Sequence, residues 1–242
     1  MSAKALTKVG NPYLILCEGF QDRHFIETLL ADRQISRFTV CSTWGLVQHS
    51  GNTHFQESLD ALTGLTDFED TLRSIIIVAD SDSDPETAFR NITAQIAQSE
   101  EIAGPPPRRY PVPTAPLRVA YGKPSVAVVL IPWADRPGNL ETLLLDAVRA
   151  ERMDEMECAE MFGACVRASE WDIGPQSKLM LRAYLGANHP PNPEVNLSKL
   201  WTKAKIKKLI PIACPAFNQL ASYLHGFDAT HTALARDTGV LS

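Results

Sequence analysis

The sequence predicts an α/β fold in which helices cover both faces of a parallel sheet. Four short apolar runs rich in β-branched residues alternate with segments of helical periodicity, and this alternation is typical of βαβ units. Two of the runs end directly in carboxylate residues. More helix follows, so the 242 residues are predicted to form an α/β domain over 12–150 and a helical extension over 151–242 that packs on it.

The predicted strands are short apolar runs bounded by polar or turn residues. The run that begins at Ser74 is apolar without interruption, which predicts a strand buried on both faces. The four strands are expected at Tyr13–Cys17, Arg37–Thr43, Ser74–Ala79 and Val126–Ile131.

The predicted helices carry their apolar residues on one face. After the first strand, Asp22 is placed to cap a helix whose apolar face holds Phe25, Ile26, Leu29 and Leu30. Pro85 suits the first turn of a later helix. Further helices are expected at Phe55–Leu65, at Glu86–Ala103, from about Leu140, and at Met153–Val166.

The segment 104–116 interrupts the α/β part with six prolines. This proline density excludes a helix or a central strand and favours extended backbone. We expect a surface excursion that joins two core elements and that a short linker can replace without loss of the fold. A recognition segment for a partner domain is the alternative.

Composition and charge narrow the protein class. Hydrophobic residues make up 45% and charged residues 21%, which is typical of a globular protein. The net charge of −5 argues against non-specific coating of nucleic acid. No apolar run is long enough to cross a bilayer, the start of the chain lacks a secretory apolar core, and the five cysteines form no C-x-x-C pair. We therefore expect a cytoplasmic protein with no membrane partner and no zinc site.

Carboxylates follow two of the predicted strands. Glu18 ends the first, and Asp80, Asp82 and Asp84 follow the third at alternate positions. Because parallel strands end at one edge of a sheet, neighbouring strands would bring Glu18 close to the Asp80–Asp82 pair. Crowded carboxylates repel one another, and a hard cation such as Mg²⁺ relieves that repulsion. A solvated acidic turn is the alternative.

These residues resemble a known domain. An apolar strand, Glu18-Gly19, Asp22 and a helix, followed by an apolar strand and Asp80-Ser81-Asp82, look like the Toprim domain of topoisomerases, bacterial primases, OLD-family nucleases and small recombination proteins. The resemblance covers about residues 12–150. It implies a Rossmannoid Toprim-like sheet, with Glu18 as general acid/base or metal ligand and the two aspartates holding Mg²⁺ for phosphoryl transfer.

A further segment, Pro137-Gly138-Asn139-Leu140-Glu141, resembles a group of stand-alone, mostly uncharacterised bacterial Toprim-like proteins. Asp84 and Glu141 are weaker candidates for a second metal. No G-x-x-x-x-G-K-[ST] motif occurs in the sequence, so the ATPase half of OLD nucleases is absent from it, and we expect an ATPase or helicase as a partner protein.

The sequence therefore predicts a nuclease that uses Mg²⁺ or Mn²⁺ to cleave or transfer at a phosphodiester. We expect it to act in phage defence or DNA repair, and we favour DNA over RNA as its nucleic-acid partner. Its predicted catalytic residues are Glu18, Asp22, Asp80 and Asp82, and its predicted metal ligands are Glu18, Asp80, Asp82, Asp84 and Glu141. The alternative is a catalytically inactive Toprim-fold module that serves as a partner or regulator in a larger complex.

Overall fold

The computed structural model describes residues 6–104, 106–202 and 206–237. Pro105 of the proline-rich segment and residues 203–205 and 238–242 of the predicted extension lie outside the described residues. The strands are β1 Tyr13–Cys17, β2 Phe38–Ser42, β3 Ser74–Asp80 and β4 Ser125–Ile131. The α-helices are α1 Phe20–Asp32, α2 Thr43–Val47, α3 Phe55–Leu62, α4 Phe68–Thr71, α5 Pro85–Gln98, α6 Leu140–Glu151, α7 Met153–Cys165, α8 Ile173–Asn188 and α9 Asn218–Asp237.

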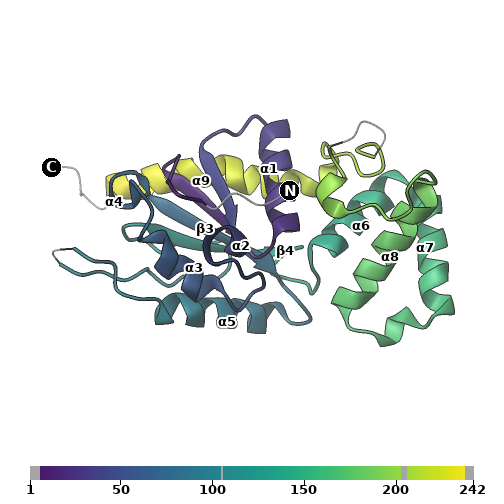
Figure 1. The fold of residues 1–242 in the computed structure, drawn as a ribbon, viewed down its shortest axis with the longest axis horizontal. Helices are drawn as coiled ribbons and strands as arrows, with labels where there is room; N and C mark the ends of the chain where they lie inside the picture. The colour runs from purple at the N-terminus through teal and green to yellow at the C-terminus, as the bar shows by residue number, and fades with distance from the viewer. Residues whose placement is uncertain (1–5, 105, 203–205, 238–242) are drawn as a thin grey trace.

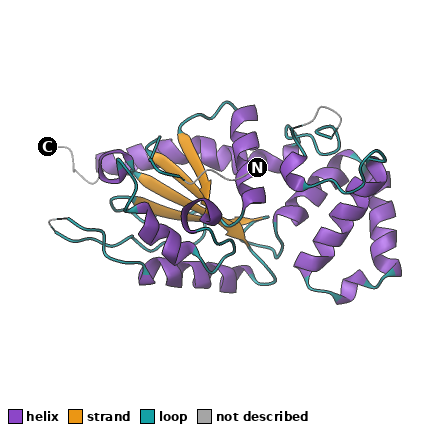
Figure 2. Cartoon of the chain, viewed as in Figure 1, coloured by secondary structure: helices purple, strands orange, loops and turns teal. Residues whose placement is uncertain are grey.

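The four strands form one parallel sheet in the order β2-β1-β3-β4 (Figure 2). This confirms the predicted α/β class with its parallel sheet. Cys17 at the end of β1 pairs with Val78 of β3, and Asp80 at the end of β3 pairs with Ile131 of β4. The carboxyl ends of the two central strands therefore meet at the middle of one sheet edge.

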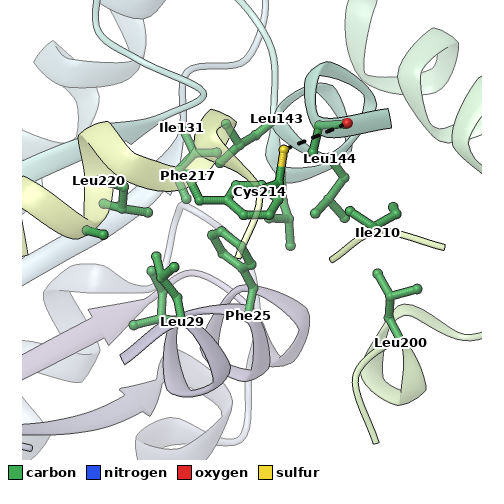
Figure 3. Close-up of a cluster of buried hydrophobic side chains, with 14 of the residues drawn as sticks. Phe25, Leu29, Ile131, Leu143, Leu144, Leu200, Ile210, Cys214, Phe217 and Leu220 are labelled. Carbon is green, nitrogen blue, oxygen red and sulfur yellow. Dashed lines mark hydrogen bonds between the residues drawn. The ribbon is translucent and has the colours of Figure 1, made fainter. Parts of the chain in front are cut away.

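Helices cover both faces of the sheet, and each face has its own hydrophobic core. Alternate strand residues point to opposite faces: Ile15, Ile76 and Val129 pack with α1, α6 and α9, while Leu16, Ile77 and Val128 pack with α3 and α5. Figure 3 shows the first core where α1 and α6 meet the segment before α9, with Phe25 and Phe217 rings 5.1 Å apart. The unbroken apolar character of β3 follows from burial on both faces.

The helical extension has two parts with different positions. Helices α7 and α8 form a lobe beside α6, at the end of the molecule away from α4 (Figure 1). The chain then returns through the short 3₁₀ helices Leu197–Lys199 and Pro215–Phe217, and α9 lies along the sheet. Helix α9 therefore belongs to the core of the α/β domain. No described helix is long and apolar enough to span a membrane.

Several element boundaries differ from the prediction. Helix α5 ends at Gln98 rather than at Ala103, because Ser99 is extended and Ile102 pairs with Arg108 in an antiparallel bridge. Helix α3 ends at Leu62 rather than at Leu65. Both differences lie at helix ends, which are the least regular part of a helix.

The proline-rich segment is more than a surface excursion. Tyr110 and Pro113 are buried, and the Tyr110 hydroxyl donates to the carbonyl of Leu59 at 2.9 Å. After the prolines, Leu117 and Ala120 hydrogen-bond to Val128 and Val126 of β4. The expectation that a short linker can replace this segment stays a prediction, and the packing of Tyr110 in the core on the α3 and α5 face argues against it.

Candidate functional site

Glu18 and Asp80 lie side by side at the carboxyl edge of the sheet. The Glu18 N–H donates to the Val78 carbonyl at 3.1 Å, so β1 runs one residue further along β3. The Thr43 hydroxyl donates to the Glu18 carbonyl at 2.7 Å. The Asp80 N–H in turn donates to Oε2 of Glu18 at 3.4 Å, which places the Glu18 side chain over the end of β3. The two predicted acidic strand ends therefore meet.

Asp22 joins this pair from the first turn of α1. Its Oδ2 atom accepts a hydrogen bond from the Gly19 N–H at 3.0 Å. Gly19 is the residue before the helix and Asp22 is its third residue, so Asp22 caps the helix start from the third helical position rather than from the N-cap itself. The carboxylate still satisfies a backbone donor at the helix start, where negative charge is favourable.

The N-terminus of α6 approaches the same edge from the other side. The Leu140 N–H donates to Oδ1 of Asp80 at 3.0 Å. Asn139 caps this helix, because its Oδ1 atom accepts from the Thr142 N–H at 3.0 Å. The same oxygen accepts from the Ser177 hydroxyl of α8 at 2.8 Å. Asp80, the start of α6 and α8 are thus linked by consecutive hydrogen bonds.

A short loop between β4 and α6 sets this geometry. Gly138 has a φ of +143°, and its N–H donates to the Asp82 carbonyl at 2.7 Å. A Cβ atom at Gly138 would lie 2.7 Å from Thr142 Oγ1 and 2.9 Å from Pro132 Cδ. The buried Ser81 hydroxyl lies within 3.1 Å of the carbonyl oxygens of Ile131 and Gly138. The glycine is therefore needed both for its backbone conformation and for its lack of a side chain.

A cavity of about 590 Å³ opens at this edge. Four carboxylates line it: Glu18, Asp22, Asp80 and Glu141. Glu141 is buried, with 7% of its surface exposed. Phe20, Lys178 and Asn196 also line the cavity. Four of the residues that the sequence predicts for the site therefore line one open cavity.

The other two predicted residues lie outside this cavity. Asp82 is exposed, and its Oδ2 atom accepts from the Asn52 side chain at 2.9 Å. Asp84 caps α5 by accepting from the Glu86 N–H at 3.1 Å, and the Thr87 hydroxyl, which also donates to it, lowers its pKa. The backbone of Asp82 is in the left-handed conformation, with a φ of 51°. The side chains of the three aspartates therefore point in different directions, although they alternate along the sequence.

Burial and mutual repulsion raise the pKa values of Glu18, Asp22 and Asp80. Burial, followed by the charge of Asp22, raises the pKa of Glu18 to about 7. Burial and the charge of Glu141 raise the pKa of Asp22 to about 6. Burial, Asp22 and Glu18 raise the pKa of Asp80 well above its ordinary value. Such strongly shifted carboxyls in a cavity are typical of functional sites.

Lys178 is a site residue that the sequence does not reveal. It lies on α8, in the helical extension, and its ammonium lowers the pKa values of both Glu18 and Asp22. Its neighbour Ser177 is buried and bonded to Asn139. Lysine in an amphipathic helix carries no local signal of function, since only the packing of α8 on α6 brings it to the cavity.

The donor set of the cavity suits a hard cation. All four acidic side chains offer carboxylate oxygens, which Mg²⁺ and Mn²⁺ prefer. In residues 6–104, 106–202 and 206–237, no three Cys, His, Asp or Glu side chains converge closely enough to hold a metal by themselves. Mg²⁺ is usually held by one or two carboxylates with water and substrate phosphate, and the adjacent pair Glu18 and Asp80 meets that requirement.

A larger cavity of about 760 Å³ lies between α7 and α8. Its walls are mainly apolar and come from residues such as Ala159, Phe162 and Leu179. It contains none of the strand-end carboxylates. The smaller cavity is therefore the candidate functional site, because its carboxyls with raised pKa values lie at the carboxyl ends of parallel strands.

Comparison with known proteins gives one result. No curated protein and no solved structure matches the chain. Residues 12–225 match one family, and this range includes the whole sheet, most of both cores and the α7–α8 lobe with Lys178. Because the match covers most of the chain, the protein belongs to the family described as protein of unknown function (DUF3226).

Proposed function

We propose that the protein is a Toprim-like phosphodiesterase that uses Mg²⁺ or Mn²⁺ to cleave nucleic acid, with DNA as the preferred substrate. The observation that carries this proposal is the crowding of Glu18, Asp22, Asp80 and Glu141 around one cavity at the carboxyl edge of a parallel sheet. Together with Gly19 and the Asp80-x-Asp82 pair, they match the residues through which the sequence resembles the Toprim domain.

Each residue of the cavity has a role that its environment supports. Asp80, fixed by the Leu140 N–H, would hold the metal ion with help from Glu18 or Glu141. The ion would polarise a phosphoryl oxygen and lower the pKa of bound water. Glu18, whose pKa is about 7, is suited to take a proton from the attacking water and return it to the leaving oxygen. Burial and, after it, the charge of Asp22 keep the pKa of Glu18 high.

The direct test is cleavage by the purified protein with Mn²⁺ on plasmid, single-stranded DNA and RNA. We expect wild-type protein to cut at least one substrate, and Asp80→Asn and Glu18→Gln each to lose about 100-fold or more of the rate, because metal-centred stabilisation and general base catalysis are each worth that much. The Asp80→Asn substitution keeps a side-chain oxygen that can accept the hydrogen bond from the Leu140 N–H. We therefore expect the variant to fold, so that the loss of rate reports on the metal site.

Asp84→Asn is the matched control. It makes the same chemical change four residues away, its side chain lies outside the cavity, and asparagine also caps helices well. We expect it to cut like the wild type. A wild type that cuts nothing under any of these conditions would leave the inactive partner module as the better account. Equal activity in Asp80→Asn and wild type would show that the site assignment is wrong.

A further inference from the structure

The carboxylate cavity continues into a second, more enclosed one of about 280 Å³. The two share Gln21, Glu141, Lys178 and Asn196. The second cavity adds Arg182 and apolar walls from Leu181 and Leu185 of α8 and from Val195 and Leu197. It therefore lies between the start of α1 and α6 on one side and the helical lobe on the other.

Two cations lie along this second cavity. Lys178 and Arg182 are one turn apart on α8, so their side chains share one face of the helix. Over the described ranges, neither makes an ion pair with a carboxylate within 4.0 Å. Two unpaired cations on a wall next to a site for phosphoryl chemistry are available to an anionic ligand.

The position of these cations is fixed relative to Asp80. Ser177, next to Lys178, is 3% exposed and donates to Asn139 Oδ1 at 2.8 Å. Asn139 caps α6, and the first N–H of α6 donates to Asp80. The lobe is thus bonded directly to the element that orients the proposed metal ligand, as a built subsite requires.

We infer that Lys178 and Arg182 bind the backbone phosphate next to the one that is cleaved, which makes the second cavity a subsite for a single strand of nucleic acid. This inference rests on the proposed function. A strand whose scissile phosphate lies at Glu18 and Asp80 continues past Lys178 toward Arg182. The apolar walls suit a sugar or an unpaired base, and the enclosure excludes the paired strand of a duplex.

The test measures binding without cleavage. A short fluorescein-labelled DNA single strand is titrated with Asp80→Asn protein in metal-free buffer, and binding is followed by fluorescence anisotropy. The Kd of this parent protein is compared with the Kd of variants that also carry Lys178→Gln, Arg182→Gln or both substitutions. We expect each change to weaken binding about tenfold, which is typical of one charge-assisted hydrogen bond. The slope of log Kd against log salt should fall by about 0.7 for each phosphate that is no longer neutralised.

Three controls make the result specific. Lys178→Arg should restore most of the affinity, and Lys207→Gln, an exposed lysine outside both cavities, should change neither affinity nor salt slope. A labelled duplex should bind more weakly than the single strand. Unchanged affinity and salt slope in the folded double variant would overturn the inference, as would failure of the Asp80→Asn parent to bind any single strand. This assay needs no catalysis, so it tests the subsite alone. A wild-type protein that binds a single strand through Lys178 and Arg182 but does not cleave it would count against the proposed function and not against the subsite.

Discussion

At the scale of single residues, the acidic cavity is held together by backbone donors. Glu18, Asp22 and Asp80 each use one oxygen to accept a hydrogen bond from a main-chain N–H, donated by Asp80, Gly19 and Leu140 respectively. These bonds fix the side chains while their charges repel one another. The repulsion, added to burial, is why their pKa values rise, and it is the cost that a bound cation would offset.

This crowding predicts that the metal-free protein loses stability as the pH rises. The pKa of Glu18 is raised from 4.5 to about 7 in the fold, so its contribution to the free energy of unfolding is full below about pH 4.5 and is lost by about pH 7. The pKa of Asp22 is raised from 3.8 to about 6, so its contribution is lost over that range. We expect the free energy of unfolding of Glu18→Gln to fall by about 1–2 kcal/mol less than that of the wild type as the pH rises. This value is smaller than the full pKa shift would give, because the carboxylate is partly exposed.

The measurement is the midpoint of thermal unfolding from about pH 5 to about pH 8 in a chelating buffer, where 1 kcal/mol corresponds to about 2–4 °C. Glu157→Gln, a change at an exposed glutamate on α7, is the control and should follow the wild type. If the Glu18→Gln curve ran parallel to the wild-type curve, Glu18 would titrate like an ordinary surface acid.

At the scale of secondary-structure elements, the loop from Pro132 to Asn139 decides whether α6 starts in the right place. Within it, Gly138 bonds to Asp82, and Asn139 both caps α6 and accepts from α8. The sequence predicted that a helix begins near Leu140. It did not predict that this helix start touches Asp80, because that hydrogen bond joins residues 60 positions apart.

We predict that Gly138→Ala destabilises the protein by about 2–4 kcal/mol, because a Cβ atom there combines left-handed backbone strain with distances to Thr142 and Pro132 that are too short. Gly51→Ala is the matched control, since Gly51 has a similar φ of +122° but nothing within 4 Å of an added Cβ. It should cost only the strain, about 1 kcal/mol. Equal losses in chemical denaturation would show that the surroundings of Gly138 relax freely.

At the scale of the whole molecule, local patterns predicted the α/β class and the meeting of Glu18 with Asp80. Strand periodicity and parallel topology suffice for these features, because they depend on residues within one element or at the ends of neighbouring strands. The role of the extension was not predictable in this way. Lys178 and Arg182 reach the site, and α9 reaches the sheet, only through packing between segments far apart in the chain.

The return of the chain to the sheet predicts that residues near α9 contribute to global stability. Phe217 is fully buried beside Phe25, so Phe217→Ala should lower the free energy of unfolding by about 3–5 kcal/mol. Phe162 on α7 is 46% exposed, and Phe162→Ala should cost less than about 1 kcal/mol. Urea denaturation of the two variants compares them, and similar losses would mean that the C-terminal segment does not complete the core.

The most direct test of the proposed metal site is a calorimetric titration of Mn²⁺ into metal-free protein at about pH 8, where the carboxyls of Glu18 and Asp22 are mostly ionised and their protons compete less with the metal. We predict saturable binding to wild type and to Asp84→Asn with similar affinity, and at least about tenfold weaker binding to Asp80→Asn, since even changes around metal ligands cost that much. No binding to the wild type, or equal binding to all three proteins, would contradict the assignment of this cavity as a metal-dependent active site.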